Sequence, residues 1–222
     1  MNILITSATT LELQHIREKL KSLQNHNIDF CTTGIGCTFT TYALAKKLHN
    51  ANFDLILNIG IAGSFVNHIT IGTTVVVESE IFGNLGITYP HKFSTLFDEK
   101  LMNENAEPFT CGKLLCPYLK IFDLKNIQSV CGITVDTTSG EQNQIEKIKT
   151  MFNADIETME GAAFFYVCLS EKIPFLEIRT ISNYIEPRDK SKWDIALALN
   201  NLANTVFDFL NNLQSQQIKI IK

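Results

Sequence analysis

The chain has 222 residues, of which 45% are hydrophobic and 19% charged, a size and composition that suit one α/β domain over residues 1–222. The formal net charge of -4 and the isoelectric point near 5.7 leave no basic footprint for nucleic acid or anionic lipid. The expected partners are therefore small molecules or other proteins.

The class of protein is narrowed further by its cysteines, its histidines and its apolar runs. The six cysteines are scattered and none forms a CxxC pair, so we expect buried, reduced thiols and a cytoplasmic protein. The five histidines show no metal-ligand spacing, which predicts no metal site and no cofactor. The opening MNILITSATTLE has no basic region before its apolar run, and no apolar segment approaches the ~20 residues of a membrane span. We therefore expect a soluble protein without a membrane partner.

Short apolar runs alternate with longer amphipathic runs along the chain. In the first part, the pattern predicts strands at 2–8, 28–34, 53–63 and 72–82, with helices at 11–23 and 37–50. Residues 82–128 contain prolines and weak periodicity, and we expect loops there that shape a pocket. The last part predicts strands at 129–136, 154–159 and 174–182, with helices at 141–152, 160–172 and 191–214.

This alternation predicts a three-layer α/β sandwich in which helices flank a central mixed, mostly parallel β-sheet. In such folds, ligands bind beyond the carboxyl ends of the strands. The residues that follow each predicted strand are therefore the candidates for a functional site.

The first strand is followed by SATTLE, which places Glu12 in the first turn of a helix. The simpler interpretation is that Thr9 or Thr10 caps the helix and Glu12 interacts favourably with its dipole. The alternative is a carboxylate at the mouth of a site, where it acts as a base.

Two further strand ends carry small residues that allow close approach. NIGIAG follows the third strand, and Gly60 and Gly63 would let backbone amides approach a ligand, although tight turns need glycine anyway. Glu160 follows Met159 and precedes a small-residue turn, so it either favours the helix dipole or receives the two hydroxyls of a ribose.

The run PFLEIRTISN carries a charge inside an apolar strand and an amide at its end. Arg179 costs several kcal/mol in a buried strand unless it is paired, and Glu12 and Glu160 are its candidate partners. Asn183, where this strand ends, is either a turn former or a functional group.

Taken together, these motifs resemble the nucleoside phosphorylase and nucleosidase superfamily. The resemblance is carried by SATTLE, by NIGIAG, and by ETMEGAAFFYVC with IRTISNYIEPRDKSKW, and it is closer to the nucleosidases, the futalosine hydrolases in particular. It implies hydrolysis of the N-glycosidic bond of futalosine, releasing hypoxanthine on a route to menaquinone. It also implies a homo-oligomer, a dimer or larger, acting on a small purine nucleoside.

The resemblance assigns roles position by position. It implies that Glu12 handles the attacking water, that Glu160 grips the ribose hydroxyls above Met159, and that Arg179 supports both carboxylates. Ala62 and Gly63 fall in the turn that contacts the ligand. Ile61 stands where adenine-specific relatives carry a serine.

Asn183 falls where the adenine-specific relatives carry an aspartate that contacts the purine at N7 and the 6-amino group. A 6-oxopurine presents acceptors at both O6 and N7, and an amide NH2 can donate to either. The resemblance therefore implies a preference for 6-oxopurines, without an obvious proton donor for the leaving base.

Three alternatives remain open on the sequence. One is another purine nucleosidase, of the inosine or methylthioadenosine type. A phosphorylase is the second, but only three arginines are available to hold phosphate, at positions 17, 179 and 188. The third is a non-catalytic purine-binding sensor on the same scaffold, against which the retention of Glu12 and Glu160 argues.

Overall fold

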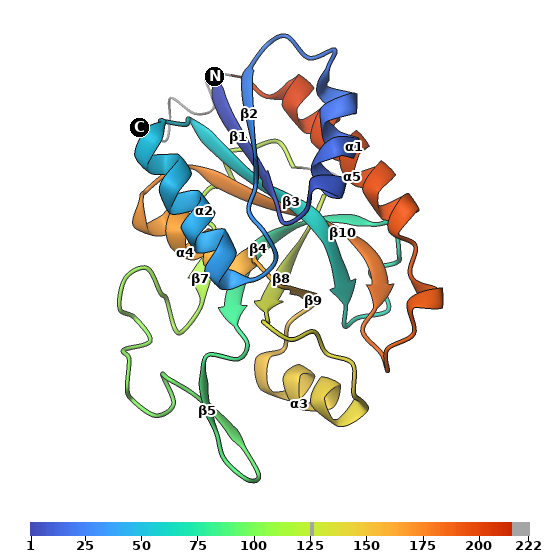
Figure 1. Ribbon diagram of the computed structural model, residues 1–222. Coiled ribbons are helices and arrows are strands. Elements are labelled where there is room, and N and C mark those ends of the chain that lie inside the picture. Colours follow the sequence, from blue (N-terminus) through green and yellow to red (C-terminus); the bar gives the residue numbers. More distant parts are fainter. Residues whose placement is uncertain (125–126, 215–222) are drawn as a thin grey trace.

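The computed structural model describes residues 1–124 and 127–214 (Figure 1). The strands in this part of the chain are β1 (Asn2–Ser7), β2 (Asn27–Thr32), β3 (Leu55–Ser64), β4 (Thr74–Phe82), β5 (Gly86–Thr88), β6 (Phe93–Thr95), β7 (Leu114–Leu115), β8 (Gln128–Thr134), β9 (Ile156–Thr158) and β10 (Phe175–Tyr184). The helices are α1 (Thr10–Leu20), α2 (Cys37–Asn50), α3 (Gln142–Phe152), α4 (Gly161–Ser170) and α5 (Ile195–Asn212), with a 3₁₀ turn η1 (Lys190–Lys192).

The central sheet is mixed and mostly parallel, as predicted. Its strands run in the order β10-β4-β8-β9-β3-β1-β2, and β10 also pairs with β3, so that five of them close into a ring. The pairs β1–β2, β1–β3, β3–β10, β4–β8 and β8–β9 are parallel, whereas β10–β4, β3–β9 and β4–β7 are antiparallel. Because the ring includes β9, the short strand between α3 and α4, it brings β3, β9 and β10 together at one end of the sheet.

Two pairs of helices flank the sheet, α1 with α5 and α2 with α4 (Figure 1). Helix α4 begins with Gly161, Ala162 and Ala163, all buried, and these small side chains let its first turn lie close to the sheet. Phe164 and Phe165 then pack edge-on against Phe175 of β10. The first turn of α4 is thereby held beside the ends of the strands.

The predicted elements occur close to their expected ranges, with one clear correction at the C-terminal helix. Residues 191–214 were expected to form one helix, but Lys190–Lys192 form a separate 3₁₀ turn and α5 begins only at Ile195. The reason is the cap: the side chain of Asp194 accepts a hydrogen bond from the backbone N–H of Leu197, which starts the helix there.

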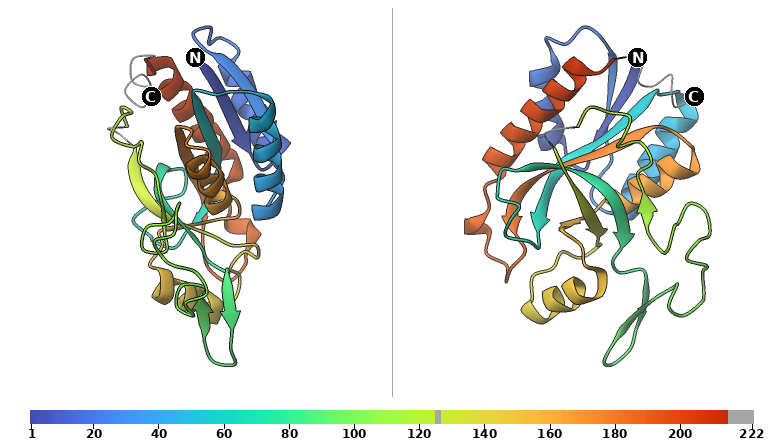
Figure 2. Two further views of the ribbon diagram at one scale, coloured as in Figure 1. Left: turned by 90° about the vertical axis from the view of Figure 1, so that its left-hand side faces the viewer. Right: turned by 180° about the vertical axis from the view of Figure 1, so that it is seen from behind.

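The expectation that residues 82–128 shape the pocket is wrong for the described residues of this segment. The segment projects from one end of the sheet and carries the small hairpin of β5 and β6 (Figures 1 and 2). It is held by Phe109, whose ring packs against those of Phe82, Phe97 and Tyr166. The segment therefore packs against α4 through Phe109, and none of its described residues lines the cavity of the candidate site.

The cysteines are all free, as expected, but they are not uniformly buried. Cys116 and Cys168 lie in the core, whereas Cys111 is exposed in the projecting segment. Among the helices that the structure describes, none is both long enough and apolar enough to cross a membrane.

Candidate active site

A cavity of about 370 Å³ opens at the carboxyl ends of β1, β3, β9 and β10. The seven residues that the sequence predicts for the site all line it: Ala62, Gly63, Glu12, Met159, Glu160, Arg179 and Asn183. The structure thus brings together residues that lie up to 171 positions apart, the separation of Glu12 and Asn183 (183 minus 12). We call the part of the cavity formed by Glu12, Glu160 and Arg179 the sugar end and the part around Asn183 the base end, after the ligand groups that the sequence analysis expects there.

Glu12 belongs to a capping box and is also held by groups outside the helix. Thr9 caps α1, and its backbone N–H and hydroxyl both donate to Oε2 of Glu12, at 3.1 and 2.7 Å. The hydroxyl of Ser7 donates to the same oxygen at 2.7 Å, while the N–H of Ile61 donates to Oε1 at 3.3 Å. Both interpretations of SATTLE are therefore compatible, since the cap fixes a buried carboxylate that lines the cavity.

The two oxygens of Glu12 differ in what they can still accept. Oε2 already receives three donors, which occupies the directions available to it. Oε1 receives only the N–H of Ile61 and retains a lone pair for another donor. Oε1 is therefore the oxygen that can take a proton from a water molecule in the cavity.

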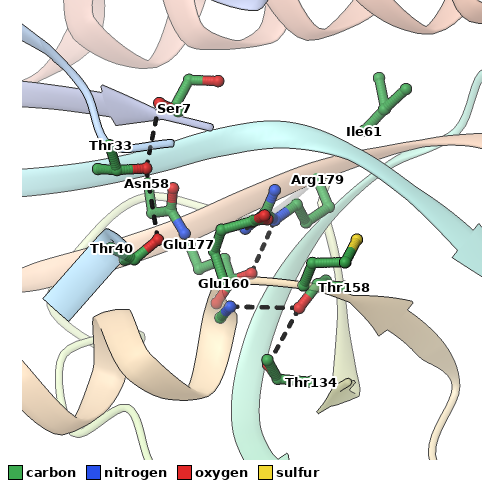
Figure 3. Close-up of polar contacts among 12 residues, drawn as sticks. Ser7, Thr33, Thr40, Asn58, Ile61, Thr134, Thr158, Glu160, Glu177 and Arg179 are labelled. Carbon is green, nitrogen blue, oxygen red and sulfur yellow. Dashed lines mark hydrogen bonds and ion pairs between the residues drawn. The ribbon is translucent and has the colours of Figure 1, made fainter. Parts of the chain in front are cut away.

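Glu160 is buried at the start of α4, and its carboxylate faces Arg179 (Figure 3). Its Oε1 accepts from the backbone N–H of Gly36 at 3.1 Å, and its Oε2 lies 3.8 Å from Nη2 of Arg179. Burial raises the pKa of Glu160, and the positive charge of Arg179 opposes that rise. The carboxylate keeps free lone pairs toward the cavity, as a group that receives hydroxyls requires.

Arg179 is 1% exposed, and its closest partner is one that the sequence analysis missed. Its Nε donates to Oε1 of Glu177 at 2.7 Å, whereas the predicted partner Glu160 lies farther away. Glu177 and Arg179 are two apart on β10, and residues at that spacing in a strand point to the same face. That periodicity was the signal in the sequence that could have identified the pair.

Gly60 makes the sugar end possible. A Cβ at this position would lie 2.3 Å from Nη1 of Arg179 and 2.9 Å from Oε1 of Glu12. Gly60 is also the register partner of Arg179 on the neighbouring strand, so both positions face the same way. A glycine is therefore required at position 60, because the side chains of Arg179 and Glu12 occupy the space where a Cβ would lie.

A second buried acid, Glu80 on β4, lies behind Glu177. A Cβ on Gly161 would lie 2.2 Å from Oε1 of Glu80 and 2.8 Å from Oε1 of Glu177, so the two carboxyl groups share one small space. Glu80 is completely buried, and the hydroxyl of Thr134 donates to it at 2.8 Å. Burial raises the pKa of Glu80 well above the usual value, and the charge of Glu177 raises it further. The fold therefore favours the protonated form of Glu80 more than solvent would.

Asn183 is the penultimate residue of β10, so it lies in the sheet and does not form a turn. Its Oδ1 accepts from the hydroxyl of Ser182 at 2.8 Å, and its Nδ2 donates to the carbonyl of Tyr184 at 3.0 Å. An amide nitrogen carries two hydrogens, so one N–H remains for a ligand. The neighbours of Asn183 thus fix its amide with a single donor available to the cavity.

Other residues that line the cavity were not predicted to do so. Glu157 and Ser139 lie at the base end, and Arg188 and Trp193 lie on the loop after β10. The guanidinium of Arg188 donates to the hydroxyl of Thr138 at 2.9 Å and lies 5.4 Å from the Trp193 ring centroid. Only Glu157 had a signal in the sequence, as an acid inside a predicted strand.

This geometry suits cleavage of a bond beside a sugar. Two carboxylates and one arginine surround the sugar end, where developing positive charge on a ribose would be stabilised. Residues 1–124 and 127–214 contain no group of three His, Cys, Asp or Glu side chains that could hold a metal ion. Glu12, Glu160 and Arg179 can supply acid–base and electrostatic chemistry.

The chain is similar to known proteins in sequence and in fold. The profile of the "Phosphorylase superfamily" matches residues 4–213. A futalosine hydrolase of Thermus thermophilus is 29% identical over 189 residues, covering 84% of this chain and 82% of its own. A 5'-methylthioadenosine/S-adenosylhomocysteine nucleosidase of Staphylococcus carnosus is 24% identical over 217 residues, covering 94% and 92%. Among solved structures, a futalosine hydrolase mutant of Helicobacter pylori superposes with a TM-score of 0.79 at 17% identity, covering 96% and 100%.

The fold, the site and the match over 4–213 assign a class: the chain belongs to the phosphorylase superfamily. Within that superfamily it is a purine nucleosidase, that is, an N-glycosyl hydrolase. The relatives with that activity divide between two kinds of nucleoside, so the substrate has to be argued from the base end of the cavity.

Proposed function

We propose that this protein hydrolyses the N-glycosidic bond of futalosine, releasing hypoxanthine and dehypoxanthine futalosine in menaquinone biosynthesis. The observation that carries the proposal is the amide of Asn183, which presents one N–H at the base end of the cavity. Hypoxanthine offers acceptors at O6 and N7, and that N–H can serve either of them. The similarity to the futalosine hydrolase of T. thermophilus supports the same substrate.

In the proposed reaction, Glu12 is the general base. Its Oε1 removes a proton from the attacking water as the bond to the base breaks. Glu160 receives the ribose hydroxyls, and both carboxylates favour the positive charge that develops on the sugar. Met159 packs against the ribose, and Ala62 and Gly63 border the ligand.

Arg179 positions the two catalytic carboxylates in this reaction. Glu177 holds its Nε at 2.7 Å, and Nη2 then points toward Glu160. One positive charge among several acids keeps Glu160 able to ionise despite its burial. The leaving purine takes its proton from solvent or from another group, because the Asn183 amide has no acidic proton to give.

Water is favoured over phosphate as the nucleophile. The cavity is lined by two arginines, of which Arg179 is engaged by Glu177 and Glu160, while Arg188 donates to Thr138. The third arginine, Arg17, lies 4.7 Å from the ring centroid of Phe30 and outside the cavity. A phosphate ion would therefore find acids rather than free cations around the sugar end.

A panel of substrates tests the proposal. Purified protein is incubated with futalosine, aminofutalosine, inosine and methylthioadenosine, with and without phosphate, and the released base and sugar are separated by chromatography. We expect hypoxanthine from futalosine at a rate independent of phosphate, with no sugar phosphate formed. Rapid release of adenine from methylthioadenosine, with none of hypoxanthine from futalosine, would contradict the proposal and leave the chain a nucleosidase of the other kind.

A further inference from the structure

Glu157 is a buried acid that the proposed reaction does not use. It is the middle residue of β9, it is 7% exposed, and it lines the base end of the cavity. Among the described residues, no lysine, arginine or histidine nitrogen lies within ion-pair distance of it. A carboxylate in such a place is costly unless hydrogen-bond donors compensate it.

Ser139 supplies part of that compensation and fixes the carboxylate. Its backbone N–H donates to Oε1 of Glu157 at 2.9 Å, and its hydroxyl donates to Oε2. Each oxygen therefore keeps a lone pair. Burial raises the pKa of Glu157, and the two bonds from Ser139 oppose that rise. A further donor supplied by a ligand would favour the ionised form in the same way.

The sheet places Glu157 and Asn183 on either side of Gly63. Gly63 pairs in register with Glu157 of β9 on one side and with Asn183 of β10 on the other. Register partners project to the same face, and neighbouring strands are ~4.8 Å apart, so the two Cα atoms lie roughly 10 Å apart. The side chain of Ile185, and not one from Gly63, covers the space above the glycine. The carboxylate of Glu157 and the amide of Asn183 therefore border the same part of the cavity, and the side chain of Ile185 lies over the glycine between them.

The edge of a 6-oxopurine matches these two borders. It presents a donor at N1–H followed by acceptors at O6 and N7, whereas a 6-aminopurine presents an acceptor at N1. A carboxylate accepts a hydrogen bond from N1–H of the 6-oxopurine, but it faces the N1 lone pair of the 6-aminopurine. An unpaired buried acceptor of this kind is a strong means of rejection, because the wrong base leaves both groups unsatisfied.

We propose that Glu157, held by Ser139, determines specificity by accepting a hydrogen bond from N1–H of a 6-oxopurine while Asn183 donates to the opposite part of the same base. The inference rests on the proposed function in one respect, that the base of the substrate is a 6-oxopurine. It does not depend on which substituent the sugar carries. It extends the role of Asn183, since a donor alone does not distinguish N1–H from unprotonated N1. Two residues on different strands thus recognise the base together.

Binding of free bases tests this inference separately from the reaction. Affinities for hypoxanthine, 1-methylhypoxanthine and adenine are measured by calorimetry for the wild type and for Glu157→Gln. We expect the wild type to prefer hypoxanthine over 1-methylhypoxanthine and over adenine by about tenfold or more, the worth of one buried hydrogen bond of about 1.4 kcal/mol. In Glu157→Gln, whose amide can donate to N1 of adenine, the preference over adenine should fall by a similar factor.

Each outcome has a defined meaning. If Glu157→Gln weakens all three bases equally, Glu157 only supports the loop at Ser139 and the inference is overturned. If the variant fails to fold, equal binding of hypoxanthine and 1-methylhypoxanthine by the wild type overturns it by itself. Ser139→Ala serves as a second variant, which keeps the backbone donor and should lose part of the same discrimination.

The two proposals can fail independently. If futalosine is hydrolysed but Glu157→Gln keeps the wild-type preference between bases, only the role of Glu157 is rejected. If the wild type prefers hypoxanthine through Glu157 but leaves futalosine intact, the base assignment stands and a different 6-oxopurine nucleoside is the substrate.

Discussion

The sugar end and the base end of the cavity are built on different principles. At the sugar end, charged groups are held by opposite charges or by several donors, as Glu12 is by four hydrogen bonds and Arg179 by two carboxylates. At the base end, a neutral amide and an acid lie on either side of a glycine, and in the described part of the chain no cationic nitrogen lies within ion-pair distance of that acid. In the proposed roles, the groups that cleave the bond are thus fixed before the substrate binds, whereas two hydrogen-bonding groups select the base.

The largest effect is expected from Glu12→Gln. Loss of the general base should lower kcat by about 10²- to 10⁴-fold while substrate binding stays measurable, because the amide keeps the size of the carboxylate. Steady-state kinetics and a binding isotherm on futalosine check this. Glu18→Gln, an exposed position on the same helix that pairs with Lys21, is the matched control and should have wild-type activity. Normal turnover by Glu12→Gln would remove Glu12 from the mechanism.

A substitution at Gly60 should also disturb the sugar end of the cavity. Gly60→Ala places a methyl group 2.3 Å from Nη1 of Arg179, so either the guanidinium or β3 must move. We expect a loss of about 1–3 kcal/mol in the free energy of unfolding, from overpacking, together with a fall in kcat. Gly140→Ala is the control, because its new methyl meets Arg188 at an ordinary 3.5 Å. Urea denaturation and kinetics of both variants give the answer, and a Gly60→Ala enzyme with wild-type values would show that the site is not tightly packed there.

A smaller effect, in selectivity more than in rate, is expected at the base end from Asn183→Asp. A protonated carboxyl can pair with N7 and a 6-amino group, whereas a carboxylate repels O6 and N7 of a 6-oxopurine. The ratio of kcat/KM for futalosine over aminofutalosine should fall about tenfold or more. Asn143→Asp, at an exposed position of α3, controls for added charge. An unchanged ratio would return Asn183 to a structural role at the end of β10.

The smallest expected effect is on stability alone, at Glu80. Burial and Glu177 raise the pKa of Glu80 in the folded state above its value in the unfolded chain, so the folded protein binds this proton more tightly. Its contribution therefore makes the free energy of unfolding fall as pH rises from the unfolded pKa toward the raised one. In Glu80→Gln this fall should be shallower, as measured by urea denaturation across mildly acidic to mildly alkaline pH. An identical slope in both proteins would mean that Glu80 is ionised in the fold.

The sequence predicted the sugar end better than the base end, for physical reasons. Glu12, Glu160 and Arg179 stand out because charges beside buried strands need an explanation, and the structure gathers them in one cavity. The arrangement at the base end depends on strand register: Glu157 and Asn183 are 26 positions apart (183 minus 157) and border the same part of the cavity only because β9 and β10 both pair with β3. Neither the hydrophobic periodicity nor the spacing of motifs along the sequence predicts that these two residues are close in space.

Two other misses have equally local causes. Glu177 was not predicted as a partner of Arg179, because the acids expected to pair with it follow other strands, whereas the closest acid lies two residues away on the same face of β10. The segment at 82–128 was expected to shape the cavity, but the aromatic packing of Phe109 against α4 and neighbouring rings decides its course. Such long-range packing leaves no periodic signal in a segment interrupted by prolines.

The most direct test of the central claim is a competition in one reaction vessel. The purified protein is given equal concentrations of futalosine and methylthioadenosine, and hypoxanthine and adenine are measured over time, so that the initial ratio reports the ratio of the two kcat/KM values. We predict that hypoxanthine exceeds adenine by at least about tenfold, the discrimination expected from one hydrogen bond at the base end. An excess of adenine would contradict the proposed substrate.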